Sequence, residues 1–344
     1  MCTLAGYVGE KNAAPILIEM SKRQEGLWAG FYTGLTTISK GLLHHDKVVG
    51  STLKLENETH AASFPGTVGI VHSRTNSGGD KEWGQPFVDG SKIVSCAAQG
   101  SPGLFVDNIH RIKLGDELNS KGVSFRTAVP GPVSRYPVLT NGSSIHSTEI
   151  FCASVSDEYK KCSDPVEAIK KTALRIPTEA IYLLLFRDEP EKIFVYNFNQ
   201  RLVFGRDNSG TYFASSSLSF PEQVAIWCEM PANAIAIVSK DTLEFIRFVP
   251  KQEFLVSETY PVGLEEAFLS YVYSHPGKTL GQVVGEVTKG LFPKATLVRK
   301  AAAGYQTLER LIANGEIRTE PHMVPGVNGQ GEAPQIGLFR NLKA

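Results

Sequence analysis

The sequence predicts an α+β fold, a four-layer αββα sandwich of two sheets between helices, followed by a small C-terminal domain. The first two thirds of the 344 residues hold many short runs rich in β-branched and aromatic residues, and several follow one another closely, as antiparallel strands do. Fewer helical segments lie between these groups, without the regular alternation of a barrel or dinucleotide-binding fold. Because the strands stop at 251–263, we expect a sandwich domain over residues 1–250 and a second domain over 264–344.

The predicted strands are short runs of apolar, β-branched and aromatic residues separated by turn-forming residues. They cover residues 2–8, 34–39, 47–55, 67–73, 92–98, 180–187, 192–197, 202–205, 211–215, 234–239 and 244–249.

Three helices of the first domain have recognisable starts. Asn12 can cap a helix that ends near Gly26, with Pro15 in its first turn. A second helix is expected over 147–162. A third opens at Asp164, whose carboxylate can cap a helix that has proline at its first position.

The C-terminal domain is expected to contain three helices, over 264–274, 280–291 and 295–313. Asn314 and Gly315 then break the pattern, and extended segments follow at 316–318 and 335–339. Three helices and a hairpin with a long loop are typical of a winged-helix-like domain. A helical extension that packs on the main domain would give a similar pattern.

Composition narrows the class of protein. The chain has 35 basic and 35 acidic residues, so no net field attracts nucleic acid or an anionic membrane. The five cysteines, at 2, 96, 152, 162 and 228, form no metal-binding pattern and no even disulfide set. No run approaches the length of a membrane span. We expect a cytoplasmic protein that needs no metal or cofactor.

Cys2 is the most informative residue of the sequence. Once Met1 is removed, one residue carries a thiol nucleophile and a free α-amine that can act as its base. Because an α-amine titrates near ~7.7–8 and a thiol near ~8.5, both groups can change protonation state close to neutral pH. The position therefore indicates an N-terminal nucleophile.

Two strand ends supply groups that such a nucleophile needs. The segment 69–77 ends in Arg74, whose guanidinium can hold a carboxylate through two parallel hydrogen bonds, followed by Ser77. The segment 95–100 ends in Gln99 and Gly100. Their side-chain NH2 and backbone N–H can stabilise a developing oxyanion.

With these segments, residues 1–245 resemble the class II glutamine amidotransferases, which have the N-terminal-nucleophile (Ntn) hydrolase fold. The likeness is greatest to the amidotransferase half of glucosamine-fructose-6-phosphate aminotransferase. The resemblance implies that Cys2 attacks the side-chain amide of glutamine, that Arg74 and Ser77 hold its α-carboxylate, and that Gln99 and Gly100 form the oxyanion hole. Ammonia and glutamate would then be released through a thioester.

The sequence departs from the family pattern at several positions. Gln99 stands where the family usually has Asn, and Ser147 stands where an acidic residue pairs with the glutamine ammonium. Thr75 replaces a tryptophan, and residues 28–34 replace the family's Arg-Gly-x-Asp-Ser-x-Gly segment. The residues of the catalytic centre therefore match the family pattern better than the residues expected to bind the substrate.

Each candidate site residue also has a structural interpretation. Arg74 could form a surface ion pair, Ser147 could be only the N-cap of its helix, and Gln99–Gly100 could be a simple turn. Cys96 is expected to be a packed core thiol. His44, His45 and His72 have no partners at metal-ligand spacing.

The functional prediction is glutaminase-type amide hydrolysis by Cys2, with glutamine or a related small amide as substrate. A separate subunit would accept the ammonia, a homo-oligomer is expected, and nucleic acid is not. The alternatives are an Ntn hydrolase of another linear amide, and a catalytically idle sensor whose winged helix binds nucleic acid or a partner. The near-neutral charge of the C-terminal domain gives the sensor little electrostatic support.

Overall fold

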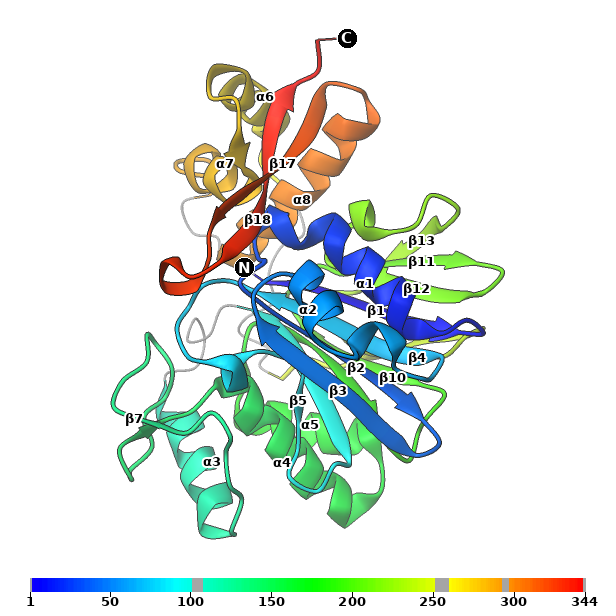
Figure 1. The fold of residues 1–344 in the computed structure, drawn as a ribbon, viewed down its shortest axis with the longest axis vertical. Coiled ribbons are helices and arrows are strands. Elements are labelled where there is room, and N and C mark those ends of the chain that lie inside the picture. The colour runs from blue at the N-terminus through cyan, green and yellow to red at the C-terminus, as the bar shows by residue number, and fades with distance from the viewer. Residues whose placement is uncertain (1, 101–107, 251–259, 293–296, 343–344) are drawn as a thin grey trace.

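The computed structural model of the protein describes residues 2–100, 108–250, 260–292 and 297–342 (Figure 1). In this part of the chain, two large antiparallel sheets face one another. The seven-stranded sheet has the order β13-β11-β12-β1-β4-β2-β3, and the six-stranded sheet has the order β15-β14-β10-β9-β6-β5. The strands of the first sheet are β1 (Thr3–Gly9), β2 (Tyr32–Ser39), β3 (Leu42–Val49), β4 (Val68–Arg74), β11 (Val203–Asp207), β12 (Gly210–Ala214) and β13 (Ala225–Glu229). Those of the second are β5 (Phe87–Val88), β6 (Val94–Gly100), β9 (Ala180–Phe186), β10 (Ile193–Phe198), β14 (Asn233–Val238) and β15 (Leu243–Arg247).

Helices cover the outer face of each sheet. The seven-stranded sheet carries α1 (Ala13–Gln24) and α2 (Thr52–Glu58), and the six-stranded sheet carries α4 (Ser147–Cys162) and α5 (Pro165–Arg175). Helix α3 (Asn108–Ser120) packs against α4. A small ribbon of β7 (Val129–Pro130) and β8 (Ser143–Ser144) lies between α3 and α4 in the sequence. The prediction of two antiparallel sheets between helices is confirmed.

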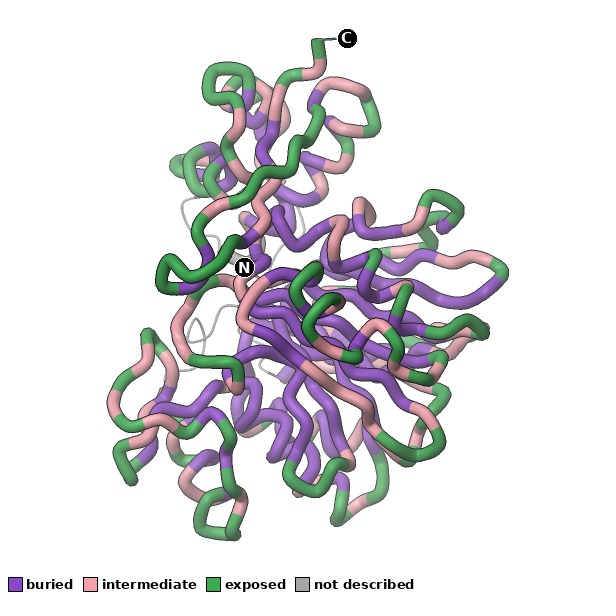
Figure 2. Tube along the Cα trace, in the orientation of Figure 1, coloured by how far each residue is buried: buried purple, intermediate pink, exposed green. Residues whose placement is uncertain are grey.

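The core is built in layers because side chains alternate across each strand. Leu4 of β1 faces the second sheet, where it joins Leu183 of β9 in one apolar cluster, whereas the neighbouring Ala5 packs with Leu17 of α1. Figure 2 shows the resulting buried strands at the centre of the molecule. Each large aliphatic side chain buried in this way contributes about 1.5–3 kcal/mol.

The expected helix starts are confirmed in the first domain. Asn12 caps α1 by accepting from Ala14 N, and Asp164 caps α5 by accepting from the N–H groups of Val166 and Glu167. Helix α4 spans the residues expected of it, but its N-cap is His146, so the interpretation of Ser147 as the N-cap is wrong.

One predicted strand is wrong. Residues 47–55 do not form a single strand, because β3 ends at Val49 and helix α2 begins at Thr52. The Ser51 side chain accepts from Lys54 N and starts the helix there, and its buried residues Thr52 and Leu55 lie one turn apart.

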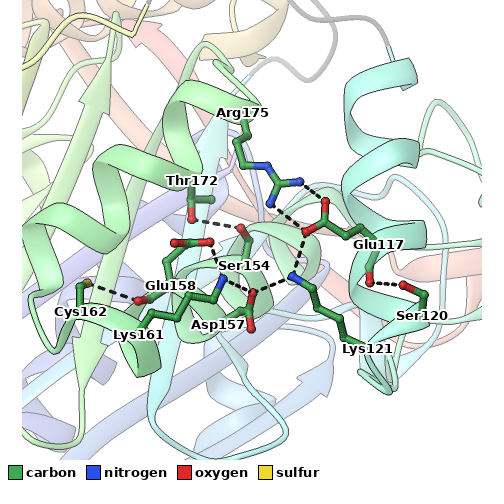
Figure 3. A network of polar contacts seen from close by, with 10 residues as sticks. All are labelled: Glu117, Ser120, Lys121, Ser154, Asp157, Glu158, Lys161, Cys162, Thr172 and Arg175. Atoms are coloured by element: carbon green, nitrogen blue, oxygen red, sulfur yellow. Dashed lines mark hydrogen bonds and ion pairs between the residues drawn. The ribbon is translucent and has the colours of Figure 1, made fainter.

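Helix α3 was missed by the sequence analysis, although its buried residues Arg111, Leu114 and Leu118 have helical spacing. Its exposed side joins α4 and α5 through an ion-pair network (Figure 3). Glu117 binds Arg175 of α5 and Lys121, and Lys121 also binds Asp157 of α4. Exposed pairs of this kind contribute about 0–1 kcal/mol each, so they orient α3 more than they stabilise it.

The C-terminal segment contains the three expected helices, α6 (Leu264–Ser274), α7 (Leu280–Val287) and α8 (Leu297–Ala313). They pack on a sheet of order β16-β18-β17, formed by β16 (Lys278–Thr279), β17 (Ile317–Pro325) and β18 (Glu332–Arg340). Figure 1 shows these elements standing at one end of the sandwich. Their apolar cluster includes Leu27 and Trp28, which directly follow α1, so this segment packs against the C-terminal elements.

None of the helices in the described part of the chain has the length and apolar character that a membrane span requires.

Candidate active site

A cavity of about 200 Å³ lies where β1 begins, β4 and β6 end, and α4 starts. It brings together Cys2, Arg74, Ser77, Gly100 and Ser147, which are far apart in the sequence. The other polar residues that line it are Thr75, Gln85, Ser134, Arg135, Tyr136, His146, Thr148 and Thr178. All but one of the site residues expected from the sequence therefore share one cavity.

Arg74 is buried, with 1% of its surface exposed, and forms no ion pair in the described part of the chain. Its Nη2 donates to Gly78 O at 2.7 Å and to the Tyr136 hydroxyl at 3.3 Å, and the guanidinium lies over the Tyr32 ring at 4.5 Å. Its Nε and Nη1 have no partner among the described residues. The interpretation of Arg74 as a surface ion-pair residue is wrong, and two N–H directions remain for an anionic ligand.

Gly100 presents its backbone N–H at an open edge of β6. Two residues earlier, Ala98 N–H donates to Gln85 Oε1 at 2.7 Å, on the edge away from β9. Because N–H groups alternate in direction along a strand, Gly100 N–H points to the same edge as Ala98 N–H, beyond the end of β5. Gly100 and Gln99 are thus strand residues rather than a turn, and the Gly100 N–H is free of the ladder to β9.

Gln99 does not line the cavity. Its side chain lies on the opposite face of β6, where Ser215 Oγ donates to Gln99 Oε1 at 2.8 Å. The same hydroxyl accepts from the backbone N–H of Leu4 at 3.0 Å. Leu4 lies two residues after Cys2, so Ser215 holds the Gln99 amide beside the start of β1. No described residue accepts from Gln99 Nε2. The oxyanion role of this side chain stays a prediction.

His146 was not singled out from the sequence, yet it is a central residue of the cavity wall. Its Nδ1 accepts from Thr148 N at 3.2 Å as the N-cap of α4, so in the neutral ring the proton lies on Nε2. Burial, reinforced by the Arg74 charge, holds the pKa of His146 well below its usual range, so the ring is neutral. Nε2 has no partner among the described residues and is therefore an unused N–H donor.

Aromatic rings fix the position of His146. The ring centroid of Tyr136 lies 4.6 Å from it, that of Phe87 4.9 Å, and that of Trp83 5.7 Å. The only sequence signal for this residue is its place directly before the predicted helix at 147, where an N-cap is expected. Tyr136 carries no such signal, because it comes from a loop that only the fold brings to the cavity.

Among the described residues that line the cavity, none carries a carboxylate. The nearest acid on α4, Glu149, accepts from the N–H groups of Arg126 and Thr127 and from Thr127 Oγ1. Burial raises the pKa of Glu149. Nor do the described residues contain a group of three or more His, Cys, Asp or Glu side chains that could hold a metal ion.

The chain was compared with protein-family models, curated proteins and solved structures. No family model matches the chain. It is 22% identical over 244 residues to the glutamine–fructose-6-phosphate aminotransferase of Pyrococcus horikoshii, covering 70% of this chain and 37% of that protein. It is 25% identical over 249 residues to the enzyme of the same name from Caldanaerobacter subterraneus, covering 72% and 36%. The chain thus spans little more than a third of the length of these relatives.

Among solved structures, the chain is similar to glutamine phosphoribosylpyrophosphate amidotransferase from B. subtilis. The TM-score is 0.57 at 15% identity, over 93% of this chain and 66% of that one, which shows a common fold. The resemblance to the class II glutamine amidotransferases that the sequence indicated is confirmed.

Proposed function

We propose that this chain, a relative of the class II glutamine amidotransferases, hydrolyses the side-chain amide of glutamine or a related small amide and releases ammonia. The nucleophile is Cys2 after removal of Met1, which lies outside the described residues. The observation that carries the proposal is the meeting, in one cavity, of Cys2, the open backbone edge at Gly100 and the unpartnered N–H groups of Arg74.

The reaction follows from these positions. The α-amine of Cys2 takes the thiol proton while Sγ bonds to the amide carbon, and the carbonyl oxygen becomes an oxyanion that Gly100 N–H stabilises. Collapse breaks the C–N bond, and the nitrogen leaves as ammonia with the proton from the α-amine. Water then attacks the thioester, which yields the carboxylate and restores the thiol. Arg74 holds the substrate carboxylate so that the amide reaches Sγ.

The test is ammonia and glutamate release by purified protein whose N-terminal mass has been measured. We expect activity from protein that begins at Cys2 and none from Cys2→Ala. Cys162→Ala is the matched control, because this thiol is also partly exposed but lies on α4, where it donates to Glu158 O and Asp164 O. Full activity in Cys2→Ala, or in protein that still carries Met1, would refute the mechanism.

For the C-terminal part, residues 264–344, we propose a winged-helix-like domain beside a catalytic domain of residues 1–250. The order α6-β16-α7-α8-β17-β18 with a three-stranded sheet supports this assignment.

The same domain is proposed to dock on the catalytic domain rather than to read nucleic acid. Glu309 of α8 binds Arg201, and its neighbour Tyr305 is buried; burial raises the pKa of Tyr305, with Glu309 and Cys2 adding to the rise. The third helix therefore faces the catalytic domain. A mobility-shift assay at low salt tests this, and tight, salt-sensitive binding to a defined duplex would contradict it.

The remaining proposals concern partners and location. A partner subunit or a further domain accepts the ammonia. Homo-oligomerisation would cover the exposed Ile226 and Trp227 on β13, an edge strand of the first sheet, and light scattering on a Trp227→Ser variant tests it. A reducing, cytoplasmic location is consistent with five cysteines that form no disulfide.

A further inference from the structure

The cavity that holds Cys2 has an unusual balance of charge. Arg74 is buried in its wall and Arg135 lies at its rim, whereas no described lining residue carries a carboxylate. His146 is held neutral with its proton on Nε2, so it adds a donor and no negative charge. The charged side chains among the described lining residues are therefore all cationic.

Two acidic residues, Glu149 and Glu179, are sequence neighbours of lining residues but do not line the cavity themselves. Glu149 accepts three hydrogen bonds from Arg126 and Thr127 and is not among the described residues that line the cavity. Glu179 lies between the lining residues Thr178 and Ala180, directly before β9, and is not itself a lining residue; Asn199 Nδ2 donates to its Oε1. Neither carboxylate belongs to the described lining of the cavity that holds Cys2.

The unused polar atoms of the cavity wall are mainly donors. Arg74 Nε and Nη1 and His146 Nε2 have no partner among the described residues, and Ser147 Oγ is likewise unpaired. Because a buried donor without an acceptor costs free energy, these groups favour a ligand rich in oxygen. A substrate ammonium would instead add a third cation and more N–H donors to the same space, with no carboxylate among the described lining residues to balance it.

We infer that the preferred substrate is a side-chain monoamide of a dicarboxylic acid that has an uncharged, oxygen-bearing group, or no group, where glutamine has its α-ammonium. This inference rests on the proposed amide hydrolysis and specifies its substrate class. Arg74 takes the carboxylate, His146 Nε2–H and Ser147 Oγ take the uncharged group, and Cys2 attacks the amide. N-acetylglutamine and glutaramate are probes of this class, and free glutamine is the matched competitor.

Binding to the Cys2→Ala protein tests the inference without turnover. We expect calorimetry to give a dissociation constant for glutaramate or N-acetylglutamine at least roughly tenfold below that for glutamine. Glutamine binding as tightly as both probes, or more tightly, would overturn the inference.

A pair of substitutions at one position isolates the charge. Ser147→Asp places a carboxylate at the first turn of α4, where the helix dipole also favours it, so the fold is retained. We expect Ser147→Asp to raise kcat/KM for glutamine and to lower kcat/KM for glutaramate, so that glutamine becomes the better substrate of the two. Ser147→Asn has nearly the same shape without the charge and should keep the wild-type preference. Reversal by both variants, or by neither, would contradict a role for charge.

Different results would refute the substrate class and the amide hydrolysis itself. Wild-type protein that releases ammonia from glutamine faster than from either probe refutes the substrate class and leaves amide hydrolysis standing. Protein with a confirmed Cys2 N-terminus that hydrolyses none of the three amides refutes the proposed function itself. In that case the binding order in Cys2→Ala still decides whether the cavity rejects an ammonium.

Discussion

Removal of the Glu309 side chain should weaken the attachment of α8 to the sandwich of two sheets. Its carboxylate accepts from Arg201 Nη1 at 3.0 Å and Nη2 at 2.8 Å. It also accepts from Ser216 Oγ at 2.7 Å and from Ser217 N at 2.9 Å. The side chains of Arg201 and Glu309 are only 7% and 14% exposed, so this is a buried pair. Glu309→Ala removes four hydrogen bonds and leaves an internal guanidinium short of a partner.

The size of the effect follows from what Arg201 retains. Removing one partner of a buried ion pair costs about 3–5 kcal/mol, because the other charge stays buried. Arg201 keeps bonds to Ser215 O at 3.3 Å and to Glu229, whose side chain is 45% exposed. We therefore expect Glu309→Ala to lower the free energy of unfolding by about 3 kcal/mol, at the lower end of that range.

Urea denaturation at neutral pH measures the difference. Glu286→Ala is the control, because Glu286 of α7 also forms an ion pair, with Lys289, but the two side chains are 48% and 68% exposed. It should change stability by less than about 0.5 kcal/mol. If Glu309→Ala is as stable as Glu286→Ala, the pair does not hold the domains together and the docking proposal loses its main support.

Three further outcomes are expected. Gln99→Ala should lower kcat by about 10²- to 10³-fold with little change in KM, as loss of an oxyanion donor does. Ser215→Ala should lower kcat less, because Ser215 only orients the Gln99 amide. An unchanged kcat in Gln99→Ala would show that this side chain takes no part in the mechanism. Arg74→Ala should instead raise KM for amides that carry a carboxylate and spare those that lack one, and equal effects on both would show that the guanidinium binds no carboxylate. Burial raises the pKa of Glu25 from 4.5 to about 7, so the folded state binds more protons than the unfolded state between these values, and stability falls as pH rises through that window. Glu25→Gln should flatten this slope in urea titrations at pH 5 and pH 7.5, whereas an unchanged slope would assign it to other groups.

Local patterns in the sequence were sufficient to identify most helices. The caps Asn12 and Asp164 act through side chains that reach only two or three residues along the chain, so their effect can be read from neighbouring letters. The prediction failed at 47–55, where apolar residues of a strand and of a helix adjoin. There the Ser51 cap, rather than periodicity, decides where the strand gives way to the helix.

The sequence by itself determined which groups are available: a thiol beside the chain start, an arginine at one strand end and a glycine at another. Their chemistry belongs to the residue types, and a strand end is a local property. Tertiary structure alone decided which of them meet. It brought Tyr136 and His146 to Arg74, and it placed Ser215 against the Gln99 amide, outside the cavity lining. The described residues that line the cavity include no Asp or Glu, and this too is a result of the tertiary structure. Contacts of this kind join segments tens of residues apart, and their geometry depends on the packing of two sheets that no local pattern encodes.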